Sequence, residues 1–292
     1  MNGILLVDKP AEWTSNDVVQ KLRGILHERR IGHAGTLDPM ATGLLTVFVG
    51  RATRAVEFAE ADAKRYRAGL RLGLSTDTQD TSGTVLHSVP QQVKEAELSS
   101  ALLSFQGTIQ QVPPMYSAVK VNGERLYRLA RKGETVERAP RTVTVDRIRI
   151  CGRDGEDWML DVSCSKGTYI RTLCHDIGEA LGCGGCMSSL RRLEAGLFKV
   201  ENALTLEQIQ EAASAGAVEQ LLLPADSLFL DRRALVLNAG DEKRVRNGGP
   251  FRSGEPDGPV RLYSASGEFL AIAEITRGEC RPIKSFFEVS VK

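Results

Sequence analysis

The sequence predicts a mixed α/β protein with a small β-rich region at its C-terminal end. Over the first 228 residues, short apolar runs typical of strands alternate with amphipathic helical segments. From about residue 231, short β-like segments separated by Gly/Pro turns replace the helical patterns. The 292 residues are 42% hydrophobic and 26% charged, an ordinary globular composition that argues against wholesale disorder.

The first elements follow from apolar periodicity and one capping signal. Residues 3–7 are a short apolar run that ends at a proline break, which predicts a buried strand. Thr14 and Asp17 have the spacing of a helix-starting box, and apolar residues then recur at helical spacing. We therefore expect an amphipathic helix over residues 16–28 and a second buried strand over residues 44–49.

Alternating patterns predict the strands that follow. Residues 65–72 alternate between apolar positions and arginine or glycine, which indicates a half-buried strand with a basic outer face. Residues 142–150 also alternate, but the phase slips, and a β-bulge near Asp146 would reconcile the two halves. Other elements expected here are a strand at residues 158–164 and helices near residues 98–105, 170–181 (ended by Gly182) and 206–215 (opened by a capping box).

The C-terminal region is expected to form a separate small unit. Its predicted strands are residues 260–263, 269–275 and 286–291. A unit of some 60 residues has little core of its own, so we expect it to pack on the main body. The predicted domains are residues 1–228 and 231–292.

Charged residues are balanced overall but not along the chain. The formal net charge is +1, so no overall basic character indicates a polyanionic partner. Residues 120–153 nevertheless contain ten Lys/Arg and four acidic residues, and residues 21–30 contain four Lys/Arg and one acidic residue. These patches fit one charged face that contacts phosphates; the alternative is an ordinary solvated basic surface.

Several protein classes are disfavoured. There is no secretory signal, and no apolar run approaches the ~20 residues of a membrane span, so we expect a cytoplasmic protein with no membrane partner. The six cysteines do not form a disulfide-scaffold pattern. Cys183 and Cys186 have the spacing of half a zinc site, but no second Cys or His pair accompanies them, so we expect no metal.

The densest chemical signal is GHAGTLDPMATGLL at residues 32–45. Three glycines, a proline and an acid lie between a basic helix and a buried strand, and loops held by rigid elements often carry reactive groups. Spacing alone also permits plainer interpretations. Asp38-Pro39 is a common turn initiator, and a lone histidine such as His33 is more often a packing or capping residue.

Residues 32–45 resemble the catalytic signature of the bacterial tRNA pseudouridine-55 synthases, the TruB family of pseudouridine synthases. The resemblance covers residues 1–228 and a tail like that family's small PUA-type RNA-binding domain, and five ordered motifs are far more specific than any one. The further matching stretches are residues 2–10 with 14–17, 64–83, 112–133, and 164–176 followed by SLRRL at 189–193.

The resemblance implies a largely antiparallel, bent sheet crossed by a cleft that carries Asp38. It implies an isomerisation without metal or cofactor, in which the N-glycosidic bond of a T-loop uridine breaks, the base rotates and carbon rejoins the ribose. Asp38 matches the family's catalytic aspartate. Whether that carboxylate attacks the ribose or base as a nucleophile or removes a ribose proton is left open.

Arg171 matches the arginine that pairs with the catalytic aspartate. Burial would raise the carboxyl pKa, and an adjacent guanidinium favours the ionised form. The plainer interpretation is a surface arginine at a helix start. Asp80 is either a hydrogen-bonding support for the site or an ordinary loop acid, and Lys9-Pro10 matches a motif that we assign to support of the fold and the RNA face.

Four further residues match positions around the family's pocket. Tyr66 is expected to stack on the extruded base and is a candidate for proton transfer, unless it is simply a strand core residue; base–aromatic stacking would offset the unstacking cost. By the same resemblance, Tyr169 lines the site beside the arginine, His33 fills the space left by flipped nucleotides, and Leu190 forms part of the pocket wall.

The expected partner is therefore the T-arm stem-loop of tRNA, bound by a monomer that needs no guide RNA. The basic excess at residues 120–153 is expected to follow the tRNA phosphates. The alternative function is an RNA-binding or tRNA chaperone protein whose chemistry is secondary.

Overall fold

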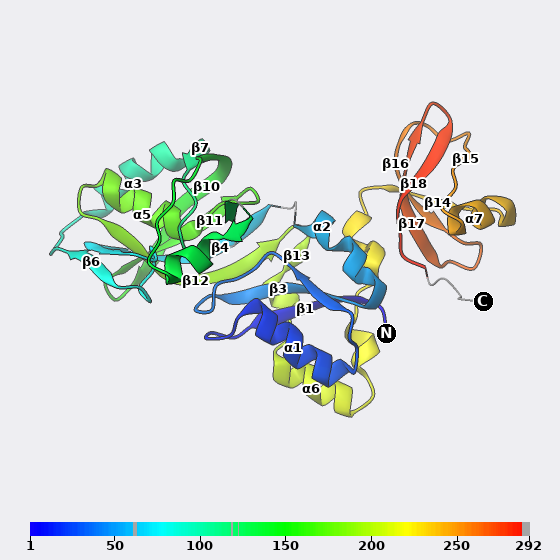
Figure 1. The fold of residues 1–292 in the computed structure, drawn as a ribbon, viewed down its shortest axis with the longest axis horizontal. Coiled ribbons are helices and arrows are strands. Elements are labelled where there is room, and N and C mark those ends of the chain that lie inside the picture. The colour runs from blue at the N-terminus through cyan, green and yellow to red at the C-terminus, as the bar shows by residue number, and fades with distance from the viewer. Residues whose placement is uncertain (61–62, 118, 122, 288–292) are drawn as a thin grey trace.

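The structure is a computed structural model that describes residues 1–60, 63–117, 119–121 and 123–287 (Figure 1). As expected, it is a mixed α/β protein with a large sheet and a smaller C-terminal sheet. No helix in the described ranges is long and apolar enough to cross a bilayer. The described α-helices are α1 (Ser15–Leu26), α2 (Val56–Ala59), α3 (Glu95–Leu102), α4 (Leu126–Arg131), α5 (Ile170–Ala180), α6 (Leu206–Ser214) and α7 (Ala239–Arg246).

The large sheet consists of β1 (Gly3–Lys9), β2 (Ile31–Ala34), β3 (Thr42–Val49), β4 (Lys64–Leu72), β7 (Gly107–Gln111), β10 (Arg141–Asp154), β11 (Asp157–Cys164), β12 (Gly185–Ala195) and β13 (Phe198–Lys199). Its order is β1-β3-β12-β4-β11-β10-β7, with β2 paired to β3 and β13 to β12. Only the β12–β3 pair is parallel among these described pairs, so the expected largely antiparallel sheet is confirmed. Two short hairpins lie outside it, β5 (Leu74–Thr76) with β6 (Val85–Ser88) and β8 (Lys120–Val121) with β9 (Glu124–Arg125).

Strands β1 and β3 are apolar along most of their length because both of their faces are covered. Leu5 and Val47 pack in a core with α1 and α6. Ile4 and Phe48 pack in a second core on the opposite face, which extends to Phe229. Burial on both faces is why the sequence shows continuous apolar runs here rather than an alternation.

The local signals in the sequence are confirmed. Thr14 Oγ1 accepts the Asp17 N–H at 3.0 Å, and the Asp17 carboxylate accepts the Thr14 N–H at 2.9 Å, which caps α1. Thr205 caps α6 in the same way. The register of β10 against β11 shifts between Val145 and Arg147, which places the expected bulge at Asp146.

The second half of the large sheet has its own core. Helices α3 and α5 pack over β4, β10, β11 and β12 (Figure 1). The segment between β2 and β3 passes from one core to the other, because Ala34 and Leu44 pack in the first half while Leu37 and Ala41 pack in the second. Asp38 therefore lies where the two halves of the sheet meet.

The C-terminal sheet contains β14 (Arg233–Val236), β15 (Phe251–Arg252), β16 (Gly258–Tyr263), β17 (Phe269–Thr276) and β18 (Glu279–Ser285), in the order β14-β16-β17-β18-β15. Its inner face packs on the main body, where the rings of Phe286 and Phe269 stack at 4.9 Å and Phe229 lies 6.0 Å from Phe286. The strand expected at residues 286–291 is wrong at its start, since β18 ends at Ser285, and residues 288–291 lie outside the described ranges. Helix α7 was not expected, because Val245 is its one buried side chain and its sequence has no apolar stripe.

Candidate active site

The loop that carries Asp38, residues 35–41, is held from two neighbouring elements. Ser15 Oγ, at the start of α1, accepts the Leu37 N–H at 2.9 Å and donates to the Leu37 carbonyl at 3.2 Å. The Lys9 ammonium, at the end of β1, donates to the Pro39 carbonyl at 3.1 Å and to two other carbonyls. Lys9 is fully buried, and burial lowers its pKa to about 8. Asp38 therefore lies between two residues, Leu37 and Pro39, whose backbone groups are held by hydrogen bonds.

Asp38 and Arg171 form a two-point ion pair. Arg171 Nε lies 3.0 Å from Asp38 Oδ2, and Arg171 Nη2 donates to Asp38 Oδ1 at 3.1 Å. The guanidinium is buried, whereas a third of the Asp38 side-chain surface remains open. Two parallel contacts between planar groups fix the direction of the carboxylate as well as its position. The pairing expected between these residues is therefore present.

The rest of the Arg171 guanidinium is also engaged. Its Nη1 donates to the Thr78 carbonyl at 3.2 Å, and Nη2 donates to the Tyr116 carbonyl at 2.9 Å. A second carboxylate, that of Asp80, lies 3.7 Å from Nε. Asp80 is also the hydrogen-bond acceptor for the Ser82 N–H at 3.0 Å, so it both orders its own loop and faces Arg171.

The pKa of Asp38 is raised although a guanidinium lies beside its carboxyl group. Burial raises the pKa of its carboxyl, and the nearby charge of Asp80 raises it further. Arg171 opposes the shift through its charge and hydrogen bond, and Lys9 adds a smaller opposing effect. The pKa remains above its ordinary value, so the arginine offsets only part of the effect of burial.

Tyr66 and Leu190 lie on adjacent central strands of the sheet. Tyr66, on β4, is half-buried, and Leu190, on β12, pairs with Ala68 two positions along β4. Both side chains belong to the apolar core that also contains Leu37 from the Asp38 loop. Burial raises the pKa of the Tyr66 phenol, which keeps it protonated and able to donate a hydrogen bond.

His33 and Tyr169 flank this region. His33 lies on β2 opposite Val47, not in the loop itself, and burial followed by the charge of Arg192 lowers its pKa. Its Nδ1 is buried without a hydrogen-bond partner among the described residues. The backbone of Tyr169 is held by Gln111, which donates to its carbonyl at 3.2 Å and accepts its N–H at 3.0 Å. This contact orients the residue just before α5.

These features define a site for an ionised acid held by a cation beside an apolar wall. Residues 23–170 match the model of the TruB family pseudouridylate synthase N-terminal domain, and residues 171–230 match that of the tRNA pseudouridylate synthase B C-terminal domain. The first match alone spans half of the chain. The chain belongs to the TruB family of pseudouridylate synthases.

Relatives of this TruB-family chain match over almost their whole length. The tRNA pseudouridine synthase B of Thermobifida fusca (strain YX) is 43% identical, covering 98% of both chains. The protein of the same name from Pseudomonas fluorescens (strain Pf0-1) is 42% identical, covering 94% of this chain and 92% of its own. That from Syntrophomonas wolfei is 44% identical, covering 94% and 93%.

Solved structures show the same fold. A Cbf5-Nop10-Gar1 complex contains a chain with a TM-score of 0.75 at 27% identity, covering 98% of this chain and 85% of that chain. A chain from an H/ACA RNP bound to a substrate RNA containing 2′-deoxyuridine gives a TM-score of 0.74 at 24% identity, with the same coverage. The pseudouridine synthase fold of this TruB-family chain is thereby established.

The sequence assigned no specific contact to three side chains that are important to the geometry. In the sequence, Ser15 and Arg192 are only members of matching motifs, and Lys9 is expected to support the fold and the RNA face. Each acts through backbone carbonyl or N–H groups of the Asp38 loop. Such contacts leave no periodic signal in the sequence. Lys9 is a partial exception, because a lysine at the end of a buried apolar strand is expected to need a hydrogen-bond partner inside the protein.

The cysteine pair does not extend to a metal site in the described part of the chain. No group of three or more His, Cys, Asp or Glu side chains there is placed to hold a metal ion. Cys183 follows α5 and Cys186 is buried on β12. Burial raises the pKa of Cys186 to about 11, which keeps this thiol neutral.

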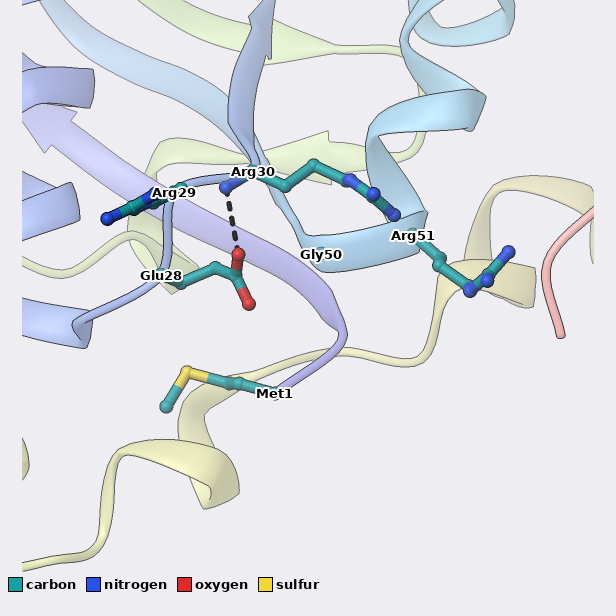
Figure 2. Close-up of a pocket in the computed structure, with 6 residues that line it drawn as sticks. All are labelled: Met1, Glu28, Arg29, Arg30, Gly50 and Arg51. Atoms are coloured by element: carbon teal, nitrogen blue, oxygen red, sulfur yellow. Dashed lines mark hydrogen bonds between the residues drawn. The ribbon is translucent and has the colours of Figure 1, made fainter. Parts of the chain in front are cut away.

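A basic hollow of about 430 Å³ lies at the other end of the β2–β3 hairpin. It is lined by Arg29, Arg30 and Arg51, with Glu28 as its acidic residue (Figure 2). The Glu28 carboxylate accepts the Arg30 backbone N–H at 2.8 Å, and no ion pair of these three arginines is present among the described residues. Three guanidinium groups beside one carboxylate leave the hollow net positive, which favours a polyanionic ligand.

Proposed function

We propose that this TruB-family enzyme converts uridine 55 in the T-loop of tRNA to pseudouridine, with Asp38 as the catalytic carboxylate. The observation that carries the proposal is the two-point contact of Arg171 with Asp38, at 3.0 and 3.1 Å, on a loop between two cores. The family and the names of its 42–44% identical relatives support tRNA as the substrate.

The reaction needs three things from the chain. An ionised carboxylate must reach the ribose or the base, either as a nucleophile or as a base, and the charge and hydrogen bond of Arg171 favour that form of Asp38. The uridine must leave its stack, and Tyr66 with Leu190 offers an aromatic and apolar surface to receive it. We assign Tyr169 and His33 to the surroundings of the extruded nucleotide.

The tRNA backbone would be held by basic surface. The hollow formed by Arg29, Arg30 and Arg51 supports a phosphate contact at one end of the β2–β3 hairpin. Residues 120–153 would supply a second basic surface. Residues 231–292, whose described part forms a sheet with its own core, would act as a PUA-like RNA-binding domain beside a catalytic domain of residues 1–228. We propose a cytoplasmic monomer that needs no guide RNA.

The decisive experiment uses purified protein and an unmodified T-arm stem-loop with no added metal, nucleotide or other protein. Pseudouridine should appear at position 55, detected by mass spectrometry or carbodiimide labelling. Asp38→Asn should abolish turnover while RNA affinity, measured by fluorescence anisotropy, stays close to that of the unchanged protein. Absence of product from the unchanged protein would contradict the proposal.

A second function, as a tRNA chaperone, is favoured by the position of the basic hollow. The length of the β2–β3 hairpin, about 10 Å, separates the hollow from the loop that carries Asp38. RNA bound at the hollow would therefore not require a catalytically active Asp38. A chaperone role predicts that cells carrying Asp38→Asn grow normally, whereas cells carrying Arg30→Glu with Arg51→Glu do not. A growth competition between the two strains separates this function from catalysis.

A further inference from the structure

Arg192 lies on β12 of the large sheet, between β3 and β4 and directly between two parts of the candidate active site. Its backbone pairs with Gly43 of β3 on one side and with Tyr66 of β4 on the other. Residues directly opposite each other on neighbouring strands project to the same face of the sheet. The side chain of Arg192 and the ring of Tyr66 therefore share a face.

The guanidinium of Arg192 joins the two ends of the Asp38 loop. Its Nη1 donates to the carbonyl of Gly35, where the loop begins, at 2.9 Å. Its Nε donates to the carbonyl of Leu44, just after the loop ends, at 2.6 Å. One planar group thus sets the distance between both anchors of the loop, and Asp38 lies between them.

The guanidinium of Arg192 is buried without a counter-ion among the described residues. Arg192 is 1% exposed, and no carboxylate among the described residues forms an ion pair with it. Its Nη2 is buried without a hydrogen-bond partner in the same part of the chain. A buried charge and an unused donor both cost stability, and an apolar side chain would fill a core at lower cost. Stability alone therefore does not account for an arginine here.

The charge of Arg192 acts on the side chains around the site. It lowers the pKa of the Tyr66 phenol and so opposes the effect of burial, whereas the charge of Asp38 raises that pKa. Arg192 also lowers the pKa of His33. Tyr66 therefore lies in the electric field of both the buried guanidinium and the catalytic carboxylate.

We propose that Arg192 is a positioning residue for the reaction, which ties both ends of the Asp38 loop to β12 and uses its remaining Nη2 donor to hold the Tyr66 hydroxyl against the extruded base. The proposal rests on the proposed function, because it assigns Tyr66 and Asp38 to one reaction centre. Arg192 itself touches neither the ribose nor the base in this scheme.

Arg192→Lys tests the proposal, because a lysine keeps the charge and the long stem but lacks the planar, forked guanidinium whose separate nitrogens reach Gly35, Leu44 and Tyr66 at once. We expect kcat on the T-arm stem-loop to fall about 100-fold, as for a displaced reacting group, with KM nearly unchanged. Arg191→Lys is the matched control. Arg191 is the neighbouring residue on the same strand and binds Asp8 at 2.7 and 3.0 Å, so its replacement should leave kcat within about twofold.

A second measurement separates positioning from simple structural support. In protein labelled with 3-fluorotyrosine, the ¹⁹F resonance of Tyr66, assigned with Tyr66→Phe, should titrate at higher pH in Arg192→Met than in the unchanged protein. A stability defect alone would not move this titration. An unchanged titration together with a kcat of Arg192→Lys within twofold of the unchanged protein would overturn the proposal.

The unchanged protein gives a further readout if both variants fail to fold. A nuclear Overhauser contact is expected between the Arg192 guanidinium protons and the Tyr66 ring, and its absence would also overturn the proposal. This contact and the Tyr66 titration do not depend on turnover. A protein that shows both but makes no pseudouridine would contradict the proposed function while leaving the placement of Arg192 intact.

Discussion

At the scale of residues, the proposed chemistry depends on a single carboxyl group. Asp38 is partly open to its surroundings, yet burial keeps its pKa above the ordinary value of 3.8 despite the guanidinium of Arg171. The second carboxylate, Asp80, contributes to the same shift from 3.7 Å beyond the arginine. Two acids facing one cation make the ionisation of Asp38 sensitive to either neighbour.

The pH dependence of catalysis should report this arrangement. A raised pKa means that Asp38 takes up a proton at higher pH than an ordinary aspartate, so kcat/KM should fall on acidification with an apparent pKa above 3.8. Asp80→Asn removes a charge that raises the pKa, so it should move this acid limb to lower pH. Asp154→Asn, at the exposed end of β10, is the control and should leave the acid limb of kcat/KM at the same pH. A shift of this limb to higher pH in Asp80→Asn would contradict the effect assigned to the Asp80 charge.

Replacing the paired arginine should affect turnover more than binding. Arg171→Lys removes the two-point interaction with Asp38 and the donors to the Thr78 and Tyr116 carbonyls. We expect kcat to fall about 100-fold or more, with little change in RNA affinity. Arg71→Lys, at a partly exposed ion pair with Asp157, should retain kcat within about twofold, and equal decreases in both variants would show that the contact with Asp38 is not special.

The hairpin of β2 and β3 positions the site at the scale of elements. Its loop returns into β3 through Gly43, whose φ is +97°, a region that residues with a side chain rarely adopt. A Cβ atom at Gly43 would lie 2.4 Å from the carbonyl oxygen of Arg192 on β12. The parallel contact between β3 and β12 therefore requires glycine at this position.

Gly43→Ala should lower the free energy of unfolding by at least about 2 kcal/mol, because both the backbone conformation and the space exclude a methyl group. Gly24→Ala is the matched control. Gly24 lies on α1 with no neighbour within 4 Å of a built Cβ, so alanine should stabilise the protein by about 0.5–1 kcal/mol. Thermal unfolding followed by circular dichroism measures both; an equal effect of the two substitutions would show that the contact with β12 does not constrain the loop.

Elements with strong local signals could be predicted, and those without could not. Helix α1 lies within about two residues of its expected bounds, because capping and apolar spacing are properties of neighbouring residues. Strand β2 falls within a stretch expected to be a loop, since its four residues lack alternation and exist as a strand through pairing with β3. Helix α7 could not be expected, because it presents one buried side chain rather than a stripe.

Charge distribution determines the RNA-facing properties of the whole molecule. The basic stretch at residues 120–153 is only partly available to bind phosphates. Two of its arginines, Arg147 and Arg149, lie 3.2 and 3.8 Å from the buried carboxylate of Asp161. The same carboxylate also binds Arg65 at 2.7 Å. In the hollow of Arg29, Arg30 and Arg51, no arginine forms an ion pair among the described residues, and Glu28 is the one acidic residue of its lining. Counting charges along the sequence therefore overestimates the positive charge that residues 120–153 offer to RNA and underestimates that of the hollow.

Neutralising the hollow should reduce the salt dependence of RNA binding. For the triple variant with alanine at positions 29, 30 and 51, the slope of log K against log salt should decrease by roughly 0.7–0.9 for each phosphate that the protein no longer neutralises. The value of kcat at saturating RNA should stay unchanged, because the hollow lies at the end of the hairpin away from Asp38. Arg71→Ala, which removes one paired cation, provides the comparison and should leave the slope unchanged. An unaltered slope in the triple variant would exclude the hollow from the RNA interface.

The amino-acid pattern was sufficient to indicate the mixed fold, the caps, the bulge at Asp146 and the motif around Asp38, because each depends on residues within a few positions of one another. It also named Arg171 through resemblance. The three-dimensional fold was needed to show that Arg171 contacts both oxygens of Asp38 across 133 positions, that Arg192 joins Gly35 to Leu44, and that three arginines share a hollow. Strand order and long-range packing bring these groups together, and neither leaves a periodic trace in the chain.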